Sequence, residues 1–88
     1  MIRADVVVTR MLGSQRLRVT VVPVGGQEQS NNYLNRDEAS EALLGIGLIP
    51  IDIQGTFEIL DGNEPGTPVS FGLKDLDEEL LRQNGFQV

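Results

Sequence analysis

Two valine-rich segments near the N-terminus alternate apolar and polar residues on either side of a short stretch that contains Gly13. Apolar side chains hold the even positions of residues 2–8 and the odd positions of residues 17–23, which is the periodicity of half-buried β-strands. Gly13 can adopt the positive φ that the first central position of a type II′ turn requires. The pattern therefore predicts a β-hairpin that turns at residues 12–15.

One register of this hairpin agrees with both sets of apolar residues. When Leu12 faces Gln15, Val8 pairs with Val19. The other apolar residues of the two strands then also pair with each other on the same face of the hairpin. Pro23 then falls near the end of the second strand, where its missing N–H is tolerated. A slip of one residue would turn one apolar set to the solvent face, so the sequence specifies this register strongly.

The next segment, residues 25–33, reads GGQEQSNNY and has almost nothing to bury, so we expect a long polar loop. A helix is predicted to follow, because Asn35 is a good N-cap and Glu38 stands three residues later, as in a capping box. Leu34 is then placed to pack on Ala39. The apolar stripe of this helix consists of Ala39, Ala42, Leu43 and Ile46, and Gly45 and Gly47 are expected to end it.

Residues 49–59 carry apolar side chains at nearly every odd position. This alternation favours one strand bent at Gly55, with a tight hairpin at residues 54–56 as the alternative. The turn-forming sequence DGNEPG follows at residues 61–66, before a second alternating run that contains Val69, Phe71 and Leu73. We expect a second hairpin that sets Phe57 opposite Phe71.

A last helix is predicted near the end of the sequence, with Asp75 as its N-cap and Glu78 at the capping-box position. Asn84 and Gly85 are expected to close this helix, and Phe86 to pack back on it as in a Schellman motif. The inner face of the helix is expected to consist of Leu76, Leu80 and Leu81.

Together these elements predict a single small α+β domain over residues 1–88. The expected order is β-β-α-β-β-α, with a mainly antiparallel sheet of four or five strands and two helices on one face. Up to the second helix this order resembles the ubiquitin-like β-grasp pattern, which is an alternative architecture. That resemblance concerns topology and carries no residue assignments.

Composition restricts the chemistry that the chain can perform. The sequence has no Cys and no His, which removes disulfides, thiol nucleophiles, zinc ligands and the commonest general base. No other nucleophile stands in an activating context, so we expect a protein that is not an enzyme and binds no cofactor. DGNEPG resembles the start of a calcium loop, but Pro65 and Gly72 stand where ligands belong, so we interpret it as a turn without a metal.

No apolar run approaches the length of a signal-peptide core or a membrane-spanning helix, so we expect a cytoplasmic protein with no membrane partner. Charge is divided unevenly: residues 1–24 have a net charge of +3 and residues 25–88 a net charge of −9. The acidic majority repels phosphate backbones, and no aromatic residue is interleaved with the arginines to stack bases, so we do not expect nucleic-acid binding.

We predict a non-enzymatic module that contacts another protein through the first hairpin, the segment 25–34 or an exposed strand edge. An arginine row can grip carboxylates or phosphates, or can be a solvated strand face, and acidic helix starts are common for structural reasons. The candidate contact residues are Arg3, Arg10, Arg16, Arg18, Gln27, Tyr33, Glu41, Asp77, Glu78 and Glu79.

Two alternatives come from other functional classes. The first is an acidic inhibitor or nucleic-acid mimic that blocks a basic site on another protein, as small phage anti-defence proteins do. The second is an RNA-binding accessory protein that uses the arginine-bearing hairpin. The opposite charges of the hairpin and of the remaining chain also allow a homodimer.

Overall fold

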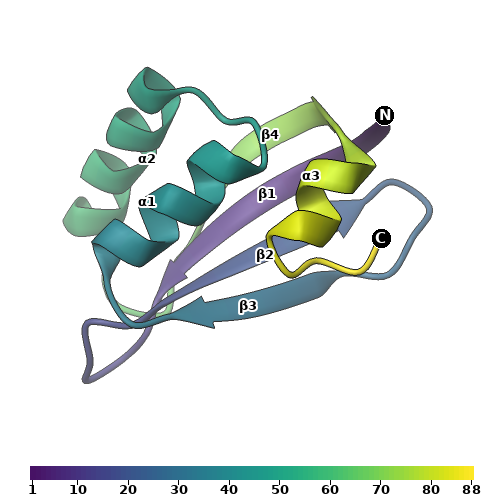
Figure 1. The fold of residues 1–88 in the computed structure, drawn as a ribbon. Helices are drawn as coiled ribbons and strands as arrows, with labels where there is room; N and C mark the ends of the chain where they lie inside the picture. The colour runs from purple at the N-terminus through teal and green to yellow at the C-terminus, as the bar shows by residue number, and fades with distance from the viewer.

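The computed structural model describes residues 1–88 and contains one four-stranded antiparallel sheet and three helices (Figure 1). Along the chain the elements are β1 (Ile2–Arg10), β2 (Leu17–Pro23), β3 (Gln29–Tyr33), α1 (Arg36–Gly45), α2 (Pro50–Gly62), β4 (Pro68–Leu76) and α3 (Glu78–Gln83). The strand order across the sheet is β3-β2-β1-β4. The helices lie on one side of the sheet, as Figure 1 shows, and the other side is open. The fold is therefore α+β as expected, with the order β-β-β-α-α-β-α instead of β-β-α-β-β-α.

The predicted first hairpin is confirmed in its register. Val8 pairs with Val19 and Val6 with Val21, and all four side chains are fully buried. The Met11 N–H donates to the Arg16 carbonyl at 3.0 Å, which closes the hairpin around the loop 12–15. Gly13 has a φ of 73° at the tip, a conformation that a glycine adopts without a steric penalty.

The expected polar loop at residues 25–33 is wrong over its second half, because Gln29–Tyr33 form the edge strand β3. The strand carries polar side chains on both faces, so it lacks the alternation in hydropathy that identifies a half-buried strand. Side-chain hydrogen bonds join it to β2: the Thr20 and Ser30 hydroxyls lie 2.7 Å apart, and the Arg18 Nε donates to the Asn32 Oδ1 at 3.1 Å.

Helix α1 begins and ends as predicted. The Asn35 Oδ1 accepts a hydrogen bond from the Glu38 N–H at 3.0 Å, and Gly47, with a φ of 104°, terminates the helix. The Glu38 carboxylate accepts from the Leu34 N–H at 3.3 Å, one residue before the N-cap. Leu34 itself remains 58% exposed, so at most part of its side chain can pack on Ala39.

The strand expected at residues 49–59 is wrong: this segment belongs to α2, which begins at Pro50. Proline favours the first turn of a helix because its missing N–H has no partner there in any case. The side chains that α2 buries are Ile53, Thr56, Phe57 and Leu60, which recur at the spacing of a helix face. Ile51 and Ile59, which the strand pattern turned inward, are 74% and 57% exposed.

The second hairpin is also wrong, because β4 pairs with β1 and not with the segment that contains Phe57. A register shift opposite Asp5 and Val7 inserts Phe71 and Gly72 as a β-bulge, and Gly72 has a φ of 85°. The bulge changes which residues face the core, so Leu73 is 53% exposed. Because the last strand is an antiparallel edge strand, the β-grasp alternative does not describe this sheet.

The last helix, α3, begins later than predicted, since Asp75 and Leu76 still belong to β4. Asp77 is its N-cap and accepts from the Glu79 N–H at 2.8 Å. The predicted end is confirmed: Gly85 has a φ of 89°, and the Phe86 N–H donates to the Leu81 carbonyl at 2.9 Å. Leu81 and Phe86 are both fully buried and join the single core between the sheet and the helices.

Candidate functional site

The outer edge of β3 exposes backbone hydrogen-bonding groups that no other strand occupies. In the β1–β2 hairpin, the Val24 N–H donates to the Arg3 carbonyl. The even-numbered residues of β2 therefore point their backbone N–H and C=O groups towards β1. Because the direction of these groups alternates along an antiparallel strand, the backbone groups of Leu17, Val19 and Val21 point towards β3. Their partners on β3 are Tyr33, Asn31 and Gln29. The N–H and C=O groups of Ser30 and Asn32 therefore point away from the sheet.

We call these outward backbone groups of Ser30 and Asn32 the β3 edge. β3 contains no proline, no charged residue and no bulge, which are the features that commonly protect edge strands from pairing. The opposite edge strand, β4, has Pro68, a bulge at Gly72 and the charged side chain of Lys74. The sheet thus has one protected edge and one unprotected edge.

On the helix side of β3 lies an open hollow of about 480 Å³. Its lining residues are Tyr33, Glu38, Glu41, Ala42 and Asn84, and we call it the Tyr33 hollow. The Tyr33 Oη is buried and has no hydrogen-bond partner. Burial raises the pKa of the Tyr33 hydroxyl, against a smaller opposing effect of the Asn31 side chain, so the hydroxyl keeps its proton at neutral pH.

The segment after α3 holds the inner side of β3 in place. The Asn31 side-chain amide donates to the Gly85 carbonyl at 3.0 Å, and the Gln87 N–H donates to the Gln29 Oε1 at 2.8 Å. Both hydrogen bonds use side chains of β3 and leave its outward backbone groups free. The β3 edge is therefore part of a strand that the remaining chain positions firmly.

The arginines that the sequence placed together are separated in the structure. Arg3 and Arg18 are exposed on the open face of the sheet, and Arg16 is exposed beside the hairpin loop. Arg10 is on the helix side, where its Nη2 donates to the Asn63 carbonyl at 2.5 Å. The four side chains do not form one row.

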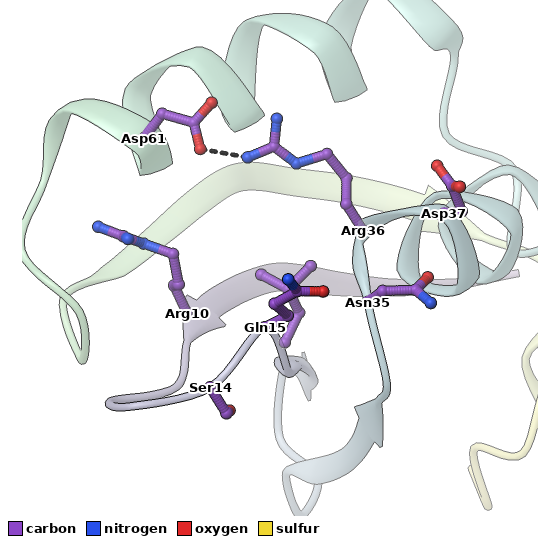
Figure 2. A pocket seen from close by; sticks show the side chains of 8 residues that line it. Arg10, Ser14, Gln15, Asn35, Arg36, Asp37 and Asp61 are labelled. Carbon is purple, nitrogen blue, oxygen red and sulfur yellow. Dashed lines mark hydrogen bonds and ion pairs between the residues drawn. The ribbon is translucent and has the colours of Figure 1, made fainter.

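Arg10 lines a second hollow of about 360 Å³ at the end of the sheet, together with Arg36 and Asp61 (Figure 2). Arg36 forms an ion pair with Asp61, and its guanidinium lies 5.1 Å from the centre of the Phe57 ring. The hydrogen bond from Arg36 lowers the pKa of Asp61 below its ordinary value of 3.8. Because its two basic and two acidic residues balance, this hollow has no net charge to attract an ion.

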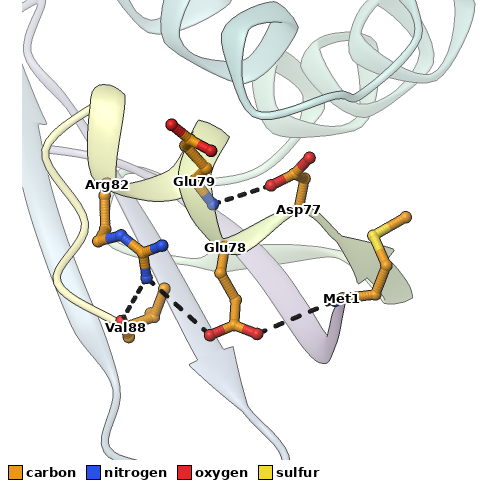
Figure 3. Close-up of polar contacts among 6 residues, drawn as sticks. All are labelled: Met1, Asp77, Glu78, Glu79, Arg82 and Val88. Carbon is orange, nitrogen blue, oxygen red and sulfur yellow. Dashed lines mark hydrogen bonds and ion pairs between the residues drawn. The ribbon is translucent and has the colours of Figure 1, made fainter.

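Asp77 and Glu78, at the start of α3, make local contacts, as Figure 3 shows. Asp77 caps the helix, and Glu78 lies 3.9 Å from the N-terminal amine and 4.0 Å from Arg82. Glu79 is exposed and has no ion pair. The N-cap role of Asp77 and the ion pairs of Glu78 give these two residues structural roles.

The remaining contact candidates lie near β3. Tyr33 and Glu41 both line the Tyr33 hollow, and Gln27 lies at the other end of the strand, in a hollow of about 330 Å³ with Pro23 and Gln29. The sequence pattern placed Gln27 and Tyr33 in a loop and gave no sign that Gln29–Tyr33 form a strand edge. No group of three or more acidic side chains is placed to hold a metal ion. None of the helices combines the length and the apolar composition that a membrane span requires.

The chain matches no protein-family model, no curated protein and no solved structure. Any functional assignment must therefore come from the fold and its surfaces.

Proposed function

We propose that this protein is a non-enzymatic interaction module that binds an extended segment of another protein by adding it as a strand to the β3 edge. The observation that carries the proposal is the pair of outward-facing residues, Ser30 and Asn32, on an edge strand without protective features. Strand addition of this kind takes its affinity from main-chain hydrogen bonds and its specificity from pockets for alternate side chains.

The β3 edge offers the N–H and C=O groups of two residues, which is about four hydrogen bonds. At a net contribution of about 0.5–1.5 kcal/mol each, the backbone alone supports weak binding, with dissociation constants in about the millimolar range or somewhat tighter. Side chains that reach the adjacent hollows must supply the remaining affinity. The Tyr33 hollow lies directly beside the edge and is suited to this role.

The edge ends at Leu34, whose N–H would be the next outward group and already donates to the Glu38 carboxylate. An added strand therefore lies along Ser30 and Asn32 and stops before the start of α1. This limit predicts a short binding segment of roughly five or six residues.

The experiment is a selection of peptides from a random displayed library on the immobilised full chain. The Ser30→Pro variant removes an outward N–H without removing a hydrogen bond to β2, so it blocks the edge and leaves the ladder intact. Ser30→Ala is the matched control, because it removes only the hydroxyl that contacts Thr20. Asp75→Pro is a second control, since the same change there lies on the β4 edge.

We expect selected peptides that bind the wild type, Ser30→Ala and Asp75→Pro alike and that lose binding to Ser30→Pro. Amide hydrogen exchange on the complex should show new protection at Ser30 and Asn32, which exchange faster than Asn31 and Tyr33 in the free protein. Peptides that bind Ser30→Pro as well as wild type, with its melting temperature showing that it is folded, would overturn the proposal.

A further inference from the structure

We infer that a second copy of this chain pairs its own β3 with the β3 edge, so that two four-stranded sheets join into one antiparallel sheet in a symmetric dimer. The inference rests on the proposed function, because a second copy and a partner segment compete for the same backbone groups. It depends on the register that two copies of the edge share, on side-chain hydrogen bonds across the pair, and on charges at the two ends of β3.

The free groups of the edge select one register. In an antiparallel pair, the outward residues of one strand exchange hydrogen bonds with the outward residues of the other. When Ser30 faces Asn32 of the second copy, both outward residues of each copy are paired, which gives about four backbone hydrogen bonds. A shift to either neighbouring register pairs an outward residue with Glu28 or Leu34. Glu28 lies outside β3, and the Leu34 N–H already has an acceptor within the chain.

The side chains of these two residues are also complementary across the pair. The Asn32 Oδ1 accepts from the Arg18 Nε at 3.1 Å, and both Nδ2 donors of Asn32 lack an acceptor in the chain. The Ser30 hydroxyl lies 2.7 Å from the Thr20 hydroxyl and can accept a further hydrogen bond. Directly opposite side chains have Cβ atoms about 4.5–5.5 Å apart on the same face. Asn32 of each copy can therefore donate to Ser30 of the other.

Charges at the two ends of β3 match in the same arrangement. Glu28 precedes the strand, and Arg16 and Arg18 lie beside its other end. All three side chains are exposed, and none forms an ion pair within the chain. Antiparallel pairing brings the first end of one β3 next to the last end of the other, so each Glu28 approaches the arginines of the second copy. β3 itself carries no charge, so no like charges lie directly opposite.

A dimer of this kind covers the β3 edge until a partner strand displaces the second copy. The second copy supplies the backbone hydrogen bonds that a peptide would supply, and it adds the Asn32–Ser30 contacts and the attraction of Glu28 to the arginines. We therefore expect a dissociation constant below about 1 mM. Partner segments that bind more weakly than the second copy are excluded from the edge.

Single-cysteine variants test the register directly, because the chain has no cysteine of its own. Ser30→Cys and Asn32→Cys are mixed in equal amounts with glutathione disulfide, and the cross-linked dimers are distinguished by mass. Only directly opposite positions bring two Cβ atoms within disulfide distance, so we expect the mixed dimer to form about tenfold faster than either dimer of a single variant.

Sedimentation equilibrium over a dilution series measures the self-association of the unmodified chain. We expect a dimer at about 1 mM that dissociates on dilution, with slower exchange of the Ser30 and Asn32 amides at the higher concentration. Ser30→Pro should be monomeric, because it removes an outward N–H. Asp75→Pro is the control on the β4 edge and should dimerise as the wild type does.

Charge reversal tests the contact between the ends of the strands. Glu28→Arg should weaken the dimer about tenfold, because the reversed charge occurs twice in a symmetric pair. Combining it with Arg18→Glu should recover most of this loss. Glu58→Arg is the matched control, since it makes the same change on the exposed surface of α2, and it should leave the dimer unchanged.

The outcomes separate this inference from the proposed function. A chain that stays monomeric up to about 1 mM, a dimer that persists in Ser30→Pro, or equal rates for the three cross-linked dimers would overturn the inference. Peptides that bind the wild type and lose binding to Ser30→Pro would still support strand addition. A dimer with the expected cross-links, formed by a chain on which no peptide can be selected, would support the inference and count against the proposed function alone.

Discussion

The Asn31 side-chain amide donates to the Gly85 carbonyl at 3.0 Å, and this contact joins the edge strand β3 to the segment that follows α3. The approach is close, because a Cβ added to Gly85 would lie 3.1 Å from the Asn31 Nδ2. β3 contributes only the half-buried Tyr33 to the apolar core, so the strand depends on polar contacts of this kind. They explain how a strand of polar residues can be well placed and still present a free backbone edge.

Substitution of Val19 tests the register of the first hairpin. Val19→Asp would place a carboxylate without a partner at a fully buried position opposite Val8, so we expect the domain to lose its cooperative thermal transition. Thr20→Asp is the control, because the neighbouring side chain points to the open face of the sheet, and its cost should be about 1 kcal/mol or less. A wild-type melting temperature for Val19→Asp would contradict the register.

A pair of glycine substitutions tests the helix α2 and the bulge of β4, neither of which the sequence predicted. Gly55 lies inside α2 with open space around the position of a Cβ, so Gly55→Ala should stabilise the fold by about 0.5–1 kcal/mol. Gly72 has a φ of 85° at the bulge of β4, so Gly72→Ala should destabilise it by about 1–2 kcal/mol. Thermal melts would show shifts of opposite sign. A destabilising Gly55→Ala would count against a helix at this position.

The mistaken strand at residues 49–59 shows why period-two patterns can mislead. Ile53, Phe57 and the exposed Ile51 and Ile59 satisfy the alternation, while the face that α2 buries also needs Thr56 and Leu60, which fall on even positions. A short apolar run is compatible with both periods, and the tertiary packing decides between them. Pro50 at the first helical position was the available signal for a helix.

The first hairpin could be predicted because one register satisfied two independent apolar patterns at once. β3 could not be predicted in this way, since an edge strand with polar residues on both faces has no hydropathy period. Tyr33 and Glu41 were named from the sequence as contact candidates, but only the pairing of β3 with β2 and the position of α1 bring them to the same hollow.

The Arg36–Asp61 ion pair predicts a specific dependence on pH. Arg36 lowers the pKa of Asp61 below 3.8. The contribution of this ion pair to the stability of the fold is therefore fully present above pH 3.8 and is lost as the pH falls through the lowered pKa. The two side chains are 47% and 49% exposed, so we expect the effect on stability to be small. In Arg36→Gln the pKa of Asp61, measured by carboxyl resonance titration, should rise towards its ordinary value.

Arg10→Gln is the matched control for this titration. Arg10 acts on Asp61 only through a charge effect that is smaller than the hydrogen bond from Arg36, so its removal should raise the pKa of Asp61 by less. Equal shifts in the two variants would show that the general charge of the hollow, and not the Arg36 contact, sets the acidity of Asp61.

The last prediction concerns the contribution of the Tyr33 hydroxyl to the stability of the fold. Since the Oη is buried without a partner, Tyr33→Phe should leave the free energy of unfolding unchanged or raise it by up to about 1 kcal/mol. Denaturant titration of the two proteins measures this difference. Tyr33→Leu, which also removes the ring, should be destabilising because the side chain packs against the core.

A loss of more than about 1 kcal/mol in Tyr33→Phe would mean that the hydroxyl has a hydrogen-bond partner in the free protein. An unchanged or raised free energy of unfolding in Tyr33→Phe would instead show that the hydroxyl loses its hydration on folding without gaining a compensating hydrogen bond.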